Sequence, residues 1–139
     1  METLNTISRQ NKDYRFLMVD DSMFARKNIS KVVEAIGGVV AGEASNGKEA
    51  VDKYFELKPD LVLMDISMPE MEGIEALSII RQRDIRARIV IVSALGYDDL
   101  VKRSIALGAK HFIVKPIDLE KVAAVIRFVL EQEGDSDEV

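Results

Sequence analysis

Hydrophobic residues in this chain follow two alternating patterns. Uninterrupted apolar runs cover residues 16–19, 61–64, 89–92 and 112–114, and each run predicts a strand that is buried on both faces of a sheet. The run 39–44 is interrupted by Gly42 and Glu43, which favours a strand at the edge of that sheet. The chain therefore contains five predicted strands.

The segments between these strands carry apolar residues at the three- and four-residue spacing of a helix. Asp21 or Ser22 is expected to cap the first helix, Asn46 the second and Asp118 the last, and Gly108 follows the end of the fourth. The apolar residues expected on the inner helix faces are Ala25, Ile29, Val32, Val33, Ile36, Ala50, Val51, Tyr54, Phe55, Ile74, Leu77, Ile80, Leu119, Val122, Ala123, Ile126, Val129 and Leu130.

Strands and helices thus alternate five times, and the connections between them are short. This alternation predicts an α/β fold in which a doubly wound, five-stranded parallel sheet is covered by helices on both faces. A length of 139 residues suits one domain. We expect that domain over residues 15–131, a flexible arm over residues 1–14 and a disordered acidic tail over residues 132–139.

Composition narrows the classes of function. The chain has no cysteine, which excludes thiol catalysis and cysteine-ligated zinc sites. Its net charge is −5, and its one basic segment, 81–88, is interrupted by Asp84 and lacks aromatic residues, so we expect a solvated turn and no nucleic-acid binding. No apolar run is long enough to span a membrane or to direct export, which predicts a soluble, cytoplasmic protein without membrane contact.

Polar residues stand at the ends of four predicted strands. Asp20 and Asp21 follow the first strand, Asp65 the third, Ser93 the fourth and Lys115 the fifth. In a doubly wound sheet the carboxyl ends of the strands meet at one edge, where ligands bind. The five side chains are therefore expected to lie close together.

Three carboxylates in one place need a compensating cation, because two carboxylates about 4 Å apart repel by roughly 4 kcal/mol at an effective dielectric constant near 20. Lys115 and a divalent cation supply that charge, and oxygen ligands with open positions suit Mg²⁺. Taken singly, each residue also has a structural explanation: Asp21 as a helix cap, Asp65 as a loop carboxylate, Ser93 as a turn residue and Lys115 as a solvated lysine. Their joint occurrence favours phosphoryl chemistry, with Asp65 as the reacting residue.

These motifs resemble those of the receiver domains of two-component response regulators, of the stand-alone chemotaxis type represented by CheY. The resemblance extends over about residues 16–130, and the family's strand order is 2-1-3-4-5, which the alternation of elements alone does not determine. The matching segments are Val19-Asp20-Asp21-Ser22, Asn46-Gly47, Met64-Asp65 with Pro69 and Gly73, Ser93-Ala94, Gly108-Ala109 and Phe112-Ile113-Val114-Lys115-Pro116.

The resemblance implies how the acidic residues act. Asp65 is the phospho-acceptor, whose carboxylate attacks a phosphoryl group donated by a histidine kinase or a small acyl phosphate. Mg²⁺ is bound by Asp21, Asp65 and the backbone carbonyl of Ser67, with Asp20 acting through water. The chain then catalyses only its own phosphorylation and dephosphorylation, and it is not an enzyme for other substrates.

The resemblance also implies roles for the residues at the last two strands. Lys115, the Ser93 hydroxyl and the Ala94 backbone N–H bind the phosphoryl oxygens, and the bond between Lys115 and the following proline is cis. Phe112 occupies the family's switch position, where movement of Ser93 makes room for an aromatic ring and alters the surface of the fourth helix, fifth strand and fifth helix. Alternatively, Phe112 only packs on the fourth helix, and it lacks the hydroxyl of the tyrosine that many chemotaxis relatives have.

The implied partners are a sensor histidine kinase of the CheA kind, an effector such as a flagellar motor switch protein, and a phosphatase. Other functions are a phosphorelay shuttle that passes the phosphoryl group to a second histidine protein, a phosphatase with an aspartate nucleophile, and a receiver-like protein that only binds partners. Haloacid-dehalogenase-like phosphatases need Asp-x-Asp after the first strand, which Asp20-Asp21-Ser22 does not provide. The complete set of acidic residues, serine and lysine argues against binding alone.

Overall fold

The structure, a computed structural model, describes the backbone of residues 13–66 and 70–136, and it describes no side chains for residues 70–72 and 133–136. This part of the chain contains the predicted alternation of strands and helices. The elements are β1 (Arg15–Val19), α1 (Met23–Ala35), β2 (Val39–Ala44), α2 (Gly47–Leu57), β3 (Leu61–Met64), α3 (Glu70–Arg83), β4 (Ile89–Ser93), α4 (Asp98–Ala106), β5 (His111–Val114) and α5 (Leu119–Ser136).

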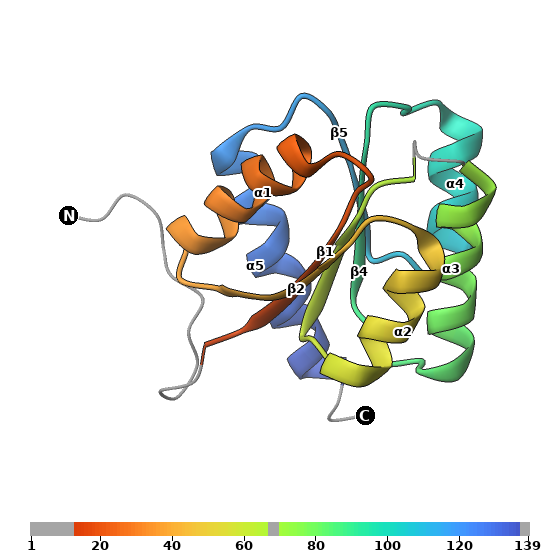
Figure 1. Cartoon of the computed structure of the whole chain (residues 1–139), viewed down its shortest axis with the longest axis horizontal. Coiled ribbons are helices and arrows are strands. Elements are labelled where there is room, and N and C mark those ends of the chain that lie inside the picture. The colour runs from red at the N-terminus through yellow and green to blue at the C-terminus, as the bar shows by residue number, and fades with distance from the viewer. Residues whose placement is uncertain (1–12, 67–69, 137–139) are drawn as a thin grey trace.

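The strands form one parallel sheet in the order β2-β1-β3-β4-β5. Helices α1 and α5 cover one face of this sheet, and α2, α3 and α4 cover the other (Figure 1). The doubly wound parallel fold is therefore confirmed, and so is the strand order that the resemblance implied. The order also places β2 at an edge, as its interrupted apolar pattern predicts.

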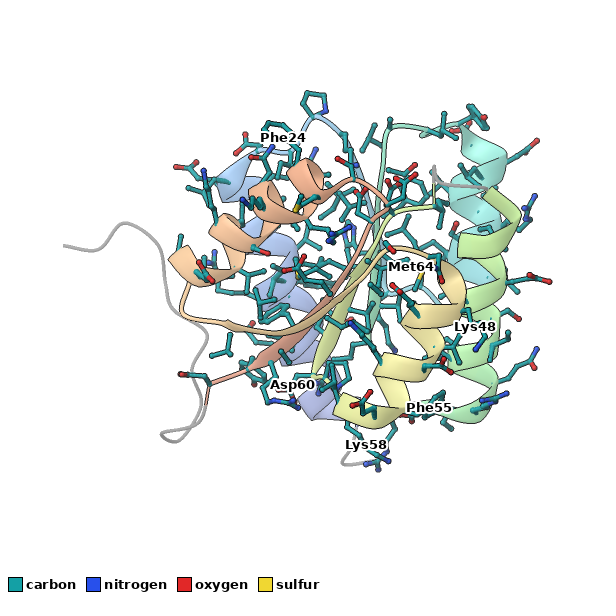
Figure 2. The ribbon with its side chains drawn as sticks, viewed as in Figure 1. Phe24, Lys48, Phe55, Lys58, Asp60 and Met64 are labelled. Atoms are coloured by element: carbon teal, nitrogen blue, oxygen red, sulfur yellow. The ribbon has the colours of Figure 1, made fainter. Side chains whose placement is uncertain are left out.

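Each face of the sheet has its own hydrophobic core, because successive side chains of a strand point to opposite faces. Phe16 and Met18 of β1 pack with residues of α1 and α5, whereas Leu17 and Val19 pack with residues of α2 and α3. Met64 of β3 belongs to the second core and lies toward α2 in Figure 2. Burial on both faces explains why the central strands are uniformly apolar.

The structure shows which of the two predicted residues, Asp21 or Ser22, caps α1. The Ser22 hydroxyl oxygen accepts a hydrogen bond from the Ala25 N–H over 3.1 Å, so Ser22 is the N-cap. Asn46 caps α2 and the Asp118 carboxylate accepts N–H groups in the first turn of α5, as predicted. The Asp21 carboxylate is therefore not engaged in capping α1.

Three predictions are corrected by the structure. Tyr14, which was assigned to the arm, is partly buried against the core beneath α1 and α5. Leu119, expected on the inner face of the last helix, is 42% exposed because it lies in the exposed first turn of α5. That helix continues to Ser136, so residues 132–136 are helical rather than disordered; Gln132 and Glu133, at the start of this extension, favour helix. The arm over residues 1–12 and the last residues, 137–139, lie outside the described ranges.

Two further predictions concern the surface. The basic segment 81–88 is only partly solvated, because Arg88 Nη1 donates to the Asp60 carbonyl over 3.3 Å and Arg81 Nη1 donates to the carbonyls of Ile85 and Ala87. These arginines join the amino-terminal end of the sheet to the neighbouring loops through their long side chains. In the described ranges, no helix has the length and apolar character needed to cross a bilayer.

Candidate functional site

The pairing of β1 with β3 brings two of the predicted carboxylates together. Val19 at the end of β1 pairs with Met64 at the end of β3, so Asp20 and Asp65 follow neighbouring positions on adjacent strands. The Asp65 N–H donates to the Val19 carbonyl over 2.8 Å, which continues the ladder past the last residue of β3. Both carboxylates are buried, Asp20 with 7% and Asp65 with 5% of its surface exposed.

The pairing of β4 with β5 brings in the predicted hydroxyl and cation. Ser93 pairs with Val114, and the Lys115 N–H donates to the Ser93 carbonyl over 2.8 Å. The peptide bond from Lys115 to Pro116 is cis, as the resemblance implied. The ends of four strands therefore meet at one edge of the sheet, the upper end in Figure 1.

Lys115 lies between the two buried carboxylates. Its Nζ donates to Asp20 Oδ2 over 3.0 Å and is 3.4 Å from Asp65 Oδ2. The second carboxylate oxygen of Asp20, Oδ1, accepts the Ser22 N–H over 2.9 Å. One cation that follows β5 thus contacts acids that follow β1 and β3, so the predicted closeness of these three residues is confirmed.

Burial and the neighbouring charges shift the pKa values of Asp20 and Lys115. Burial raises the pKa of Asp20 above its ordinary value, and the negative charge of Asp65 raises it further, whereas the Ser22 N–H and Lys115 lower it by less. Burial lowers the pKa of Lys115, but the hydrogen bond to Asp20 and the charge of Asp65 outweigh this effect and leave it above its ordinary value. The lysine is therefore protonated, and burial disfavours the charged form of Asp20.

The acidic residues present a donor set for a metal ion. Asp20, Asp21 and Asp65 each offer a carboxylate oxygen, and these oxygen atoms all lie within 4.8 Å of one another. Asp21 is exposed while the other two are buried, so the cluster opens toward solvent on one side. Hard oxygen donors with an open side fit a divalent cation such as Mg²⁺ better than a soft metal.

The remaining predicted residues surround this cluster. Ser93 is fully buried, and its Oγ accepts the Leu95 N–H over 3.0 Å, while Ala94 between them is exposed. Phe112 is partly buried against the core of the α2, α3 and α4 face, and it pairs with Ile91, two strand positions before the pair of Ser93 with Val114. Ser67, whose carbonyl was expected to bind the metal, lies outside the described residues.

A cavity of about 340 Å³ opens beside the two buried acids and the lysine. Phe24 and Ile29 of α1 form one wall, and Pro116 and Ile117 form another. The Phe24 side chain, labelled in Figure 2, lies at the same end of the molecule as the strand ends and is 75% exposed. The carboxylates are therefore accessible to a reactant from this side.

One polar residue at this site escaped the sequence analysis. Arg26 lies in the second turn of α1, donates to the Asp20 carbonyl over 2.6 Å and pairs with Glu43 of β2. Helices favour acidic residues near their N-terminus, and the first turn of α1 has none. Arg26 departs from this preference and follows Asp20 and Asp21 closely in the chain, so it is a signal in the sequence for a contact with the acidic pair.

Comparison with known proteins agrees with this geometry. Residues 16–127 match the family model of the response regulator receiver domain. The chemotaxis protein CheY of Treponema pallidum is 49% identical over 120 residues, which cover 85% of this chain and 83% of that protein. CheY of Thermotoga maritima is 48% identical over 115 residues, which cover 83% of this chain and 96% of that protein.

A solved structure extends the comparison to three dimensions. The crystal structure of the CheX–CheY–BeF₃–Mg²⁺ complex from Borrelia burgdorferi includes a chain that superposes with a TM-score of 0.80 at 42% identity, and the match covers 84% of this chain and 88% of that one. The strand order, the strand-end acids and lysine, and these relatives all agree. The chain belongs to the response regulator receiver domain family of two-component signalling, and within that family it is CheY-like.

Proposed function

We propose that this protein is a chemotaxis-type response regulator that acts through phosphorylation of Asp65. The observation that carries the proposal is the position of Lys115, which contacts the buried carboxylates of both Asp20 and Asp65. Phosphoryl transfer from an acyl phosphate or a phosphohistidine needs a nucleophile and fixed positive charge. The buried Asp65 carboxylate offers the nucleophile, and Lys115, with a cation at the acidic cluster, offers the charge.

In the proposed reaction, a carboxylate oxygen of Asp65 attacks the phosphorus atom of the donor. A phosphorus–oxygen bond forms to Asp65, and the bond to the donor breaks with its electron pair going to the imidazole of a histidine kinase or to the carboxylate of an acyl phosphate. Lys115 contacts an oxygen of Asp65 at 3.4 Å, close enough to hold a phosphoryl oxygen as a point charge. Ser93 and the Ala94 N–H take the other oxygens.

The acidic cluster is proposed to bind Mg²⁺ through Asp21 and Asp65, with Asp20 acting through water and the Ser67 carbonyl completing the set. The bound ion supplies positive charge that neutralises the phosphoryl oxygens during transfer. Support comes from the carboxylate oxygens within 4.8 Å of one another and from the Mg²⁺ named in the structure of the Borrelia burgdorferi relative.

The proposed response is a change at the surface formed by α4, β5 and α5. Ser93 is buried at the end of β4, and Phe112 lies on the neighbouring strand, so a shift of the Ser93 hydroxyl toward a phosphoryl group changes the space available to the aromatic ring. Exposed apolar side chains on this surface include Ile105, Val114 and Phe128. The proposed partners are a CheA-like kinase, a flagellar motor switch protein and a phosphatase in the cytoplasm.

Intact-mass measurement after incubation with acetyl phosphate tests the proposal. The wild-type chain should gain the mass of one phosphoryl group when Mg²⁺ is present and much less when EDTA replaces it, and Asp65→Asn should gain none. Absence of a gain in the wild type contradicts phosphorylation, and an equal gain in the variant moves the acceptor to another residue. Phosphorylation with the small donor alone would show that the chain catalyses its own phosphorylation without a kinase.

The assignment to chemotaxis needs a separate test. Phosphorylated protein should bind purified motor switch protein more tightly than the unphosphorylated form does. If the phosphorylated form instead transfers its phosphoryl group rapidly to a histidine phosphotransfer domain and shows no such gain in binding, the protein is a phosphorelay shuttle.

A further inference from the structure

Arg26 connects the loop that carries the acidic pair to the edge strand of the sheet. Its Nη1 donates a hydrogen bond to the Asp20 carbonyl over 2.6 Å, and its Nε donates to Glu43 Oε1 over 2.7 Å. The Arg26 side chain is only 15% exposed, whereas that of Glu43 is 48% exposed. The guanidinium group is thus mostly buried and is held at two acceptors, one directly after β1 and one in β2.

The carbonyl that Arg26 contacts belongs to the peptide unit between Asp20 and Asp21. A peptide unit is planar, so a fixed oxygen atom fixes the orientation of the whole unit and the direction in which Asp21 continues from it. The preceding peptide unit is fixed as well, because the Asp20 N–H donates to the Ala44 carbonyl over 3.0 Å. Arg26 therefore completes the attachment of this short stretch of backbone.

Asp21 depends on this attachment more than the other two acids do. Asp20 is held by Ser22 and Lys115, and Asp65 lies next to Lys115. Within the described part of the chain, by contrast, no hydrogen bond or ion pair holds the exposed Asp21 side chain. The position of its carboxylate near the other two therefore follows from the position of its backbone.

We propose that Arg26 is a positioning residue of the acidic site, which sets the placement of the Asp20 and Asp21 carboxylates for a divalent cation through its bond to the Asp20 carbonyl. Glu43 orients the guanidinium group from the opposite side. This inference rests on the proposed function, since it concerns the cation that the same carboxylates bind. A simple surface ion pair does not account for the arrangement, because such a pair needs neither the burial of Arg26 nor the bond to a backbone carbonyl.

Arginine suits this role because its planar group donates in two fixed directions at once. Lysine keeps the charge, but all its donors are on one nitrogen atom, so it lacks the separate Nε and Nη1 donors that contact Glu43 and the Asp20 carbonyl here. Arg26→Lys should therefore retain part of the effect and Arg26→Gln should lose it. Lys48→Gln is a matched control, because it also removes one cation and one ion pair, the exposed contact of Lys48 Nζ with Asp52 at 3.3 Å.

Calorimetric titration of the full chain with Mg²⁺ tests the proposal. Arg26→Gln should raise the Mg²⁺ dissociation constant about tenfold, which is typical when a residue that orients a metal ligand is removed. Arg26→Lys should raise it less, and Lys48→Gln should leave it unchanged. If Arg26→Gln binds Mg²⁺ with the same dissociation constant as the wild type, the inference is overturned but the proposed function stays intact. If the wild-type protein does not bind Mg²⁺, both are overturned.

Glu43→Gln tests the second half of the arrangement. Alone it should weaken Mg²⁺ binding by less than Arg26→Gln does, and in the Arg26→Gln background it should add nothing, because Glu43 acts through Arg26. Additive effects of the two substitutions would show that Glu43 acts independently, which contradicts its role as the orienting group.

Amide hydrogen exchange in EDTA separates positioning from general loss of stability. In Arg26→Gln, the Asp20 amide should exchange faster relative to the Lys110 amide, which donates to the Ile89 carbonyl at the other end of the sheet. If both amides accelerate by the same factor, Arg26 contributes only to global stability and the positioning role is wrong. Both readouts are independent of phosphorylation.

Discussion

Lys115 Nζ donates a hydrogen bond to Asp20 Oδ2 over 3.0 Å, although 95 positions separate the two residues in the chain. The same nitrogen atom lies 3.4 Å from Asp65 Oδ2, so a single protonated amine serves carboxylates that follow two different strands. Three acidic side chains converge here, and within the described part of the chain Lys115 lies within hydrogen-bonding distance of two of them, Asp20 and Asp65. The stability of the metal-free protein should therefore be sensitive to this one cation.

We expect Lys115→Gln to lower the free energy of unfolding by about 1–3 kcal/mol in EDTA, because it leaves two buried carboxylates without their shared cation. Saturating Mg²⁺ should narrow the difference, since a bound cation replaces part of the lost charge. Urea unfolding with and without Mg²⁺ measures both effects. Lys48→Gln removes an exposed cation and should change the free energy by less than about 0.5 kcal/mol. Equal losses in the two variants would contradict the compensating role of Lys115.

The raised pKa of Asp20 predicts how stability depends on pH in the metal-free protein. Between the unfolded pKa, about 3.9, and the higher folded pKa, the folded chain binds more protons than the unfolded chain. The contribution of Asp20 to stability is therefore complete below about pH 4 and is lost as the pH rises through the folded pKa. Burial is the main cause, so Asp20→Asn should remove this slope.

Urea unfolding of the wild type and of Asp20→Asn at a series of pH values in EDTA measures the difference. The stability of the wild type relative to the variant should fall as the pH rises from about 4. A relative stability that instead rises over this range means that the folded pKa of Asp20 is lowered, and the prediction is then wrong.

Gly73 of α3 packs against the backbone that follows Asp65. A Cβ atom at this position would lie 2.9 Å from the Ile66 Cα, a backbone atom that cannot move aside. In an open helix, replacement of glycine by alanine stabilises by about 1 kcal/mol, but overpacking against a fixed backbone costs about 1–3 kcal/mol. Gly73→Ala should therefore give a net loss of stability and slow phosphorylation of Asp65.

Gly96→Ala is the matched control for this substitution. Its added Cβ would lie 2.6 Å from Val114 Cγ2, the end of a half-exposed side chain that can rotate away. Thermal unfolding and the intact-mass assay compare the two variants. If Gly96→Ala loses as much stability and activity as Gly73→Ala, the special closeness of α3 to the Ile66 backbone is not the cause.

Tyr54 on α2 donates a hydrogen bond to Asp84 Oδ2 over 2.7 Å, away from the acidic site. Burial raises the pKa of the Tyr54 hydroxyl well above its ordinary value, and the bond to Asp84 raises it further. Tyr54→Phe should lower the free energy of unfolding by about 1–2 kcal/mol below pH 9 and leave Mg²⁺-dependent phosphorylation unchanged.

The difference between wild type and Tyr54→Phe should shrink as the pH rises above about 10. There the unfolded chain releases the tyrosine proton and the folded chain does not, so the stabilising contribution of the hydroxyl is lost. Tyr97→Phe, at an exposed tyrosine, should not show the initial loss of stability. A difference that grows with pH would show that the pKa of Tyr54 is lowered instead.

The sequence pattern predicted which residues form the site, but it did not predict the contacts between them. Asp20, Asp21, Asp65, Ser93 and Lys115 were identified together because a general rule places the carboxyl ends of parallel strands at one edge. That rule needs only the alternation of strands and helices, which the periodicity of apolar residues provides. The metal-binding carbonyl of Ser67 and the flexible arm over residues 1–12 stay predictions, because both lie outside the described residues.

The sequence alone therefore determined the elements, the fold class and the group of strand-end residues, because each depends on spacing along the chain. Only the tertiary structure decided that Ser22 rather than Asp21 caps α1, that Lys115 contacts Asp20 more closely than Asp65, and that Arg26 holds the Asp20 carbonyl. These contacts depend on strand register and on the reach of individual side chains between elements distant in sequence. Neither property leaves a periodic signal, so the connections of the acidic site became visible only in three dimensions.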